Sequence, residues 1–313
     1  MERDDDLGLF GPGSVTWKIH SEPILIVAGL RSLYLQALHP RAMAGVAQNS
    51  SYRQDPWGRL LRTSRYVATT IYGTTVEAEA AGRRLRALHA RMSARDPFTG
   101  EEFRIDDPEL LRWVHVTEVE SFVSTARRAG VPLSPAEIDT YFAEQRRAAA
   151  LVGLDPAEVP GSADEVASYY REIRRDLRMT KGAAETALFL TVPPAPRQLN
   201  LPLRLGLSFG PARLAYLGVA ATAFGLLPPW ARRCYGALGV PATDLSADLS
   251  VRGLRLALNA IPRRFVEGPI YRAAMERADR LHPAESAEGS SSRSTAVHGS
   301  LAGVSAPAGQ IRR

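Results

Sequence analysis

The stretch that decides the fold runs from Pro56 to Phe122. It contains three segments: PWGRLLRTSRYVATT (56–70), RRLRALHARM (83–92) and DDPELLRWVHVTEVESF (106–122). In each segment, residues of one kind recur three or four positions apart, the spacing that brings side chains to one side of an α-helix. We therefore expect three helices here and treat the rest of the chain as the shell built around them.

The first of these segments carries a basic and hydroxyl cluster. Arg59, Arg62 and Thr63 stand at positions i, i+3 and i+4, so a helix brings the three side chains to one side. Such a side can bind an anion, because guanidinium groups donate paired hydrogen bonds to carboxylates. The competing interpretation is that these arginines are simply solvated, which is the usual state of a cation on a helix surface.

The second and third segments each place a histidine on an inward side. His89 continues the helical stripe of Gly82 and Leu85, and His115 lies between Leu111 and Val119. The third helix has a clear start, since Asp107 is a typical N-cap and Pro108 suits the first turn. We expect both histidines to be at least half buried.

An inward histidine has two interpretations. It is most often a core residue that donates a hydrogen bond to a backbone carbonyl. It can also be the axial ligand of a haem or one ligand of a histidine-rich metal site. A buried haem needs its two propionates neutralised, which neighbouring arginines would do. The pattern of residues alone does not decide between these interpretations.

The composition excludes several classes. The chain has 313 residues, 45% of them hydrophobic, which suffices for a large core. Its charge is +6, but the arginines are spread among acidic residues and no nucleic-acid-reading motif occurs, so we expect no nucleic-acid partner. Cys234 is the only cysteine, which rules out a disulfide framework and a thiolate metal cluster.

The N-terminal segment and the apolar runs of the chain indicate in which cellular compartment we expect the protein. The N-terminus is acidic and has no apolar stretch of signal-peptide length, so we expect a cytoplasmic protein. The longest apolar runs, at 23–38 and 214–230, are interrupted by charge or proline or fall short of the roughly 20 residues that a spanning helix needs. Peripheral contact with a membrane stays open, since the second run could lie on its surface.

Strand-type alternation is nearly absent, so we expect an all-α fold. We expect a flexible arm at 1–13, one all-helical domain at 14–282 and a disordered tail at 283–313, which is poor in large apolar residues. His39 precedes Pro40, where a helix ends and a structural cap is the commoner role for the side chain.

Five segments taken in order resemble one protein family. They are LHPRAMAGV (38–46), DPWGRLLRTSRYVATTIYGT (55–74), RRLRALHARM (83–92), DDPELLRWVHVTEVESF (106–122) and LPPWARRCYGALGVP (227–241). They are similar to the family that holds latex-clearing protein, a rubber oxygenase, and the MpaB oxygenase of mycophenolic acid assembly. The resemblance covers about residues 14 to 275. It implies an all-helical fold with a globin-like core around one b-type haem.

The resemblance also implies roles for particular residues. By position, His89 resembles the proximal iron ligand and is therefore the expected metal-binding residue. Arg59 and Thr63 resemble the polar pair beside the haem, and His115 resembles a second histidine near the pocket. Arg62 stands where the rubber oxygenase has a lysine that can close the distal side of the iron. Because a guanidinium stays protonated and cannot ligate, the distal side is expected to be open, held by water or gated by another group.

The leading hypothesis is thus a haem b oxygenase or oxidase whose partners are O₂, an electron donor and a small apolar substrate, such as a prenylated compound or another secondary metabolite. Arg59, Arg62 and Thr63 would anchor the propionates or polarise oxygen, with His115 beside them. The alternatives are a haem carrier or sensor without turnover, a metal-free helical scaffold and, with less support, a histidine-only di-metal site, since Glu-x-x-His pairs are missing. The oligomeric state is not indicated.

Overall fold

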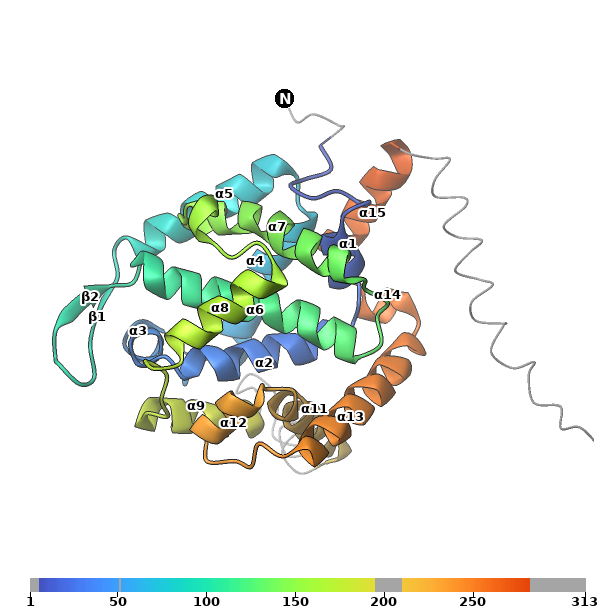
Figure 1. Cartoon of the computed structure of the whole chain (residues 1–313). Coiled ribbons are helices and arrows are strands. Elements are labelled where there is room, and N and C mark those ends of the chain that lie inside the picture. Colours follow the sequence, from blue (N-terminus) through green and yellow to red (C-terminus); the bar gives the residue numbers. More distant parts are fainter. Residues whose placement is uncertain (1–5, 51, 195–209, 282–313) are drawn as a thin grey trace, which may run out of the picture.

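The computed structural model describes residues 6–50, 52–194 and 210–281, except for the side chain of residue 265. Within these ranges the fold is all-α, as the sequence predicts, with one short hairpin (Figure 1). The helices of the N-terminal half are α1 (Val15–His20), α2 (Leu25–Ala37), α3 (Pro40–Asn49), α4 (Pro56–Tyr72), α5 (Thr75–His89) and α6 (Pro108–Arg128). Those that follow are α7 (Pro135–Val152), η1 (Pro156–Glu158), α8 (Ala163–Ile173), α9 (Lys181–Thr191), α11 (Pro211–Gly225), α12 (Pro229–Cys234), α13 (Pro241–Asn259), α14 (Arg263–Val266) and α15 (Pro269–Leu281).

The sequence places several helix starts through side-chain caps. Asp55 and Asp107 accept hydrogen bonds from the first turns of α4 and α6, each followed by proline at the first position. Thr74 and Ser134 form capping boxes that begin α5 and α7. His39 is the N-cap of α3, where its Nδ1 accepts from the Ala42 amide at 3.3 Å. Its capping role is therefore structural, as the sequence indicated.

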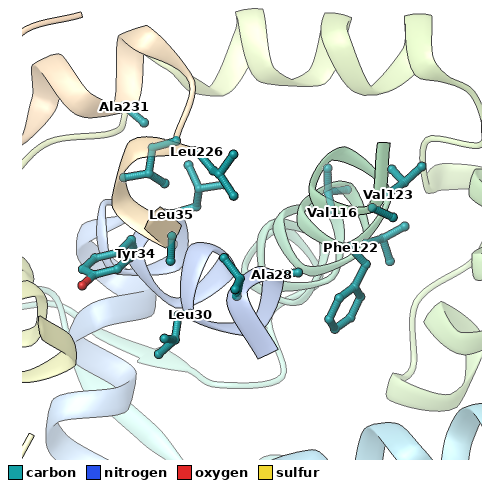
Figure 2. Packing of buried hydrophobic residues seen from close by; sticks show 14 of the residues in the cluster. Ala28, Leu30, Tyr34, Leu35, Val116, Phe122, Val123, Leu226 and Ala231 are labelled. Carbon is teal, nitrogen blue, oxygen red and sulfur yellow. The ribbon is translucent and has the colours of Figure 1, made fainter. Parts of the chain in front are cut away.

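The centre of the molecule is the packed pair α2 and α6, which make the most extensive contact of any two elements among the described residues. Figure 2 shows this core, with Leu35 of α2 against Leu226 after α11, and Ala28 of α2 toward α6. Leu30 and Phe122 point to the other side of the helix pair, away from Leu226. The α2–α6 pair thus has one side closed by α11 and an opposite side that faces the N-terminal helices.

Two elements differ from the expectation. The histidine helix ends at His89 rather than near residue 94, because the chain turns at once into a hairpin of β1 (Ser93–Arg95) and β2 (Glu102–Arg104). Each strand has only three residues, so no alternating run marks it in the sequence. The short hairpin leads directly into α6.

Helices α4 and α5 follow each other directly in the chain. Only Gly73 and Thr74 join them, and the two helices contact each other. The main contacts of α4 are with α5, α15 and α1, while its Val67 reaches the central core. Arg59 lies in the first turn of α4, and His89 is the last residue of α5.

The boundaries of the domain remain partly predictions. Part of the N-terminal segment contacts the helices, since Asp6 accepts hydrogen bonds from the amide and hydroxyl of Thr75, both at 2.8 Å. The tail predicted to be disordered lies outside the described residues. In the part of the chain that the structure describes, no helix combines the length and the apolar character that crossing a bilayer requires.

Candidate functional site

One side of α4 carries a stripe of polar residues. Arg59, Thr63, Tyr66 and Thr70 follow one another at spacings of four, three and four positions, so they share one side of the helix. Arg59 is partly buried, which lowers its pKa, and it donates to the Ser50 hydroxyl at 2.5 Å. Among the described residues it has no carboxylate partner. A desolvated guanidinium without an anion is suited to bind an acidic group.

Unsatisfied polar atoms collect on this same pair of helices. Nine buried side-chain nitrogen or oxygen atoms in the described residues lack a hydrogen-bond partner, and four of them belong to α4 and α5. These four are Tyr66 Oη, Thr70 Oγ1, Tyr72 Oη and His89 Nδ1. Each such atom costs about 1–3 kcal/mol when left unpaired. They do not share one surface, because Tyr72 packs against Trp17 and Tyr271, and the Tyr66 and Thr70 hydroxyls are close enough to interact with each other. His89 Nδ1 is therefore the atom of this group that most needs an outside partner.

His89 is held at a junction. It is the last residue of α5, and its carbonyl accepts from the Met92 amide at 3.0 Å as the chain turns toward the hairpin. Burial lowers the pKa of the imidazole, while the negative charge of Asp106 opposes that shift. The ring is therefore neutral near pH 7 and has a lone pair to offer, while its buried Nδ1 has no partner. A neutral, unpaired and oriented imidazole is the form that binds a metal ion.

A matching stripe lies on α6. His115, Glu118 and Phe122 are spaced by three and four positions, and Figure 2 shows Phe122 on the side away from Leu226. Burial lowers the pKa of His115 to about 4 and raises the pKa of Glu118 to about 7. Glu118 interacts electrostatically with Tyr66 of α4 and Tyr141 of α7. The α4 and α6 stripes therefore face each other.

The central helix α2 contributes an apolar wall. Ile26, Leu30 and Leu33 stand at i, i+4 and i+7, and Leu30 points away from the α11 side in Figure 2. Although α2 is central, Ile26 is 60% exposed and Leu33 is only partly buried. A Cβ placed on Gly29 would meet no atom within 4 Å. This side of α2 is thus apolar and only partly covered by other residues.

The structure does not bring all the predicted site residues together. Arg59, His89 and His115 are partly buried as expected, but Thr63 and Arg62 are exposed. The Arg62 guanidinium instead approaches Asp55 at 3.3 Å, on the solvent side of the first turns of α4. Helical spacing does not account for this difference. Residues 60–65 of α4 are all exposed, so this part of the helix lacks the covering neighbours that would bury Arg62 and Thr63.

Two residues of the site were missed by sequence reasoning, Tyr66 and Glu118. The available signal was their spacing. Tyr66 continues the Arg59–Thr63 stripe by three positions, and Glu118 follows His115 by three. A carboxylate next to an inward histidine on an apolar helix side is unusual enough to mark a site.

Other places in the structure suit the chemistry less well. Within residues 6–50, 52–194 and 210–281, no three His, Cys, Asp or Glu side chains gather as a multidentate metal site would require, which leaves the di-metal alternative without a ligand set there. Two surface hollows are lined largely by charged side chains, including Arg112 and Glu158. A site with a single histidine, an unpaired arginine and an apolar wall instead fits a prosthetic group with its own metal and carboxylates.

The fold is all-helical, and the candidate site combines a buried histidine nitrogen without a partner and an arginine without a carboxylate partner among the described residues. The family model described as "ER-bound oxygenase mpaB/B'/Rubber oxygenase, catalytic domain" matches residues 17–260. The chain belongs to this family and carries the catalytic domain of an oxygenase. No curated protein and no solved structure gives a significant match. The match spans α1 through α13 and so includes every site residue described above.

Proposed function

We propose that this protein is a haem b-dependent oxygenase that acts on a small apolar organic substrate, in which His89 would bind the iron. The observation that carries the proposal is the buried Nδ1 of His89, which has no hydrogen-bond partner. It is supported by the partly buried guanidinium of Arg59 on the preceding helix, which has no carboxylate partner among the described residues. Membership of an oxygenase family supports the reaction class. The haem, when bound, would supply the redox chemistry with O₂.

The residues of the chain fit the two ends of a haem. His89 offers one neutral imidazole, which is all that a protein must supply to hold haem iron on one side. Arg59 would bind a propionate, because charge-assisted bonds to a carboxylate repay its desolvation. Thr63 would add a hydroxyl donor from the same stripe. Arg62 is the weaker candidate for this role, since its guanidinium already approaches Asp55.

The remaining residues would shape the substrate side. The apolar face of α2, with Ile26 and Gly29, would contact the porphyrin or the substrate and exclude water. His115 is neutral at pH 7, because burial lowers its pKa to about 4. It can hold a proton on one ring nitrogen and accept one at the other. An electron donor and O₂ are needed for turnover, and we propose both as partners.

The proposal is tested by the optical spectrum of protein produced with haem supplied. We expect a Soret band in the wild type, its loss in His89→Ala and its retention in His115→Ala, since only one imidazole is proposed to bind iron. Far-UV circular dichroism checks that both variants fold. A wild type without any pigment, or a His89→Ala variant with an unchanged band, overturns the proposal.

A second measurement separates an oxygenase from a haem carrier or sensor. We expect the haem-loaded protein, given a chemical reductant and an apolar substrate, to consume O₂ steadily in proportion to substrate. Consumption that stops after one equivalent of bound haem is oxidised would instead favour the carrier.

A further inference from the structure

Large apolar side chains gather on one part of the protein surface, around helix α13. Of the sixteen large hydrophobic side chains that are exposed in the described residues, six lie in the short run 238–261. They are Leu238 and Val240 before α13, Leu245, Leu249 and Leu256 on α13, and Ile261 just after it. Single exposed leucines are ordinary, but a group of them along one helix marks a surface that meets an apolar partner.

Helix α13 is apolar on two opposite sides. Its inner side packs into the central core through four small or aliphatic residues, Ala247, Val251, Leu254 and Leu258. Leu245, Leu249 and Leu256 form a stripe on the outer side, since positions i, i+4 and i+11 of a helix coincide in direction. These three leucines are 63%, 63% and 71% exposed, and Figure 1 shows α13 at the edge of the molecule. A surface helix usually has polar side chains on its outer side, so the fold alone does not explain this stripe.

The acidic residues of this region are held on the inner side. The run 238–264 contains two of them, Asp244 and Asp248. Asp244 accepts hydrogen bonds from the fully buried Arg232, and Asp248 accepts one from Arg128 of α6. Their charges are therefore balanced within the fold, and the outer side of the described run 238–264 has no acidic residue.

Two arginines lie among the exposed apolar residues. Arg252 is exposed and stands between Leu249 and Leu256 on the outer stripe. Arg233 is also exposed and reaches the loop before α13, because a Cβ added to Gly239 would meet its Nη1 at 2.9 Å. A long arginine side chain can lay its stem along apolar groups while its guanidinium reaches a charged layer. The outer side of α13 thus combines apolar and cationic groups.

This combination fits the surface of a membrane that contains anionic lipids. Leucines can enter the boundary between headgroups and acyl chains, while arginines are attracted to the lipid phosphates. A second copy of the chain fits less well, because a two-fold interface joins one surface to itself and would bring the two Arg252 side chains together without an acid. We infer that the outer side of α13 and the loop before it bind peripherally to a bilayer containing anionic lipids.

The inference goes beyond the proposed function, because it requires no haem. Since α13 keeps its inner side in the protein core, it would lie in the plane of the bilayer surface and not cross it. A bilayer also dissolves apolar compounds, so a protein bound to it would meet such substrates where they are concentrated.

Co-sedimentation of the full-length protein with sucrose-loaded vesicles tests the inference. One preparation contains equal parts of phosphatidylcholine and phosphatidylglycerol, and the other contains phosphatidylcholine alone. We expect the anionic vesicles to be bound about tenfold more tightly than the neutral ones at low salt, with the difference shrinking as salt is added. Equal binding to both kinds of vesicle, or binding to neither, overturns the inference.

Variants assign the binding to α13. We expect the double variant Leu249→Ser/Leu256→Ser to bind anionic vesicles at least about tenfold more weakly, because it loses two inserted apolar side chains. Arg252→Glu should weaken binding to these vesicles by a similar factor, since it reverses a charge. The matched control is Val76→Ser/Leu88→Ser on α5, which replaces two side chains that are 59% and 54% exposed and should leave binding unchanged.

Melting temperatures check that each variant is folded. Vesicle binding that is unchanged in both the double leucine variant and Arg252→Glu, or that falls equally in the α5 control, overturns the inference. Sedimentation velocity without vesicles tests the second copy as the occupant. A wild-type dimer that the double leucine variant converts to a monomer would show that α13 is a contact between protein chains, which also overturns the inference.

Discussion

The two sides of the α2–α6 pair differ in whether their buried polar groups have hydrogen-bond or ion-pair partners. Toward α11, Arg31 is 2% exposed, yet it donates to both oxygens of Glu120, to the Ser121 hydroxyl and to the Leu226 carbonyl. Toward α4, Arg59 has no anion, and Tyr66 is left unpaired. Since a folded protein rarely leaves buried polar groups unmatched, the first side holds the fold together and the second is shaped for a ligand.

The satisfied side has further arginines of the same kind. Arg232 is fully buried and reaches Asp244 at 2.8 Å through its terminal nitrogens, although its Nε has no partner, and Arg128 binds Asp248 at 2.5 Å. Together with Arg31, these guanidinium groups also donate to carbonyls at the end of α11, including Leu226. They satisfy carbonyls that a helix end otherwise leaves without partners. On this side, arginine completes backbone hydrogen bonding.

The largest expected effect comes from removing a buried ion pair on the α11 side of the α2–α6 pair. We expect Arg31→Ala to lower the free energy of unfolding by about 3 kcal/mol, because it leaves Glu120 charged and partly buried with only the Tyr170 hydroxyl as a partner. Arg83→Ala is the control, since that exposed guanidinium only approaches Glu79 at 3.6 Å, and its loss should cost less than about 0.5 kcal/mol. Urea denaturation measures both. Similar losses for the two variants would contradict the distinction between the two sides.

The sequence predicts much of this fold because the signals are local. Proline at the first helical position, Asp or Ser caps and a 3.6-residue period mark α4, α6 and α7 within a few residues. The hairpin cannot be predicted from the sequence, because strands of three residues have no measurable period. The burial of Arg31 escapes because nothing in the run 23–38 says that a charge within it will meet Glu120, which is 89 positions away.

The candidate site is predicted only in part, for a related reason. Spacing predicts that Arg59 and His89 lie on inward sides, and both are partly buried in the structure. Whether a side chain lacks a partner depends on distant residues, so the unpaired Tyr66 and Glu118 become visible only in three dimensions. Likewise, the pairing of Arg62 with Asp55 at 3.3 Å is not evident from its position beside Thr63.

A smaller effect tests the comparison between the two sides through the pH dependence of the free energy of unfolding. Burial raises the pKa of Glu118 to about 7, whereas a glutamate in an unfolded chain titrates near 4.3. Between these values the folded state binds more protons, so the contribution of Glu118 to stability is complete below about pH 4 and is lost as the pH rises through 7. We expect Glu118→Gln to be more stable than wild type by about 2–3 kcal/mol at pH 8, with that advantage falling toward pH 5.

Thermal or urea unfolding of both haem-free proteins across this pH range measures the difference. The neighbours that face Glu118 are Tyr66, Tyr141 and His115. The tyrosine pKa values are raised by burial and that of His115 is lowered to about 4. They are present in both proteins, so subtracting one curve from the other isolates Glu118. A difference that does not change with pH would show that this carboxyl is not desolvated.

The smallest expected effect tests the unsatisfied side with two arginines of one helix. We expect Arg59→Met to weaken haem binding about tenfold, since a charge-assisted bond to a propionate is worth about 1.5 kcal/mol. Arg59→Met should also leave the unfolding free energy of the haem-free protein nearly unchanged, because no carboxylate loses its partner. Arg62→Met should alter neither quantity beyond the small value of an exposed pair. Haem titration followed at the Soret band measures the affinities. Arg62→Met weakening haem binding as much as Arg59→Met does would contradict this distinction. It would mean that Arg62 leaves its solvent-facing position when haem binds, so that both arginines of α4 contact the haem.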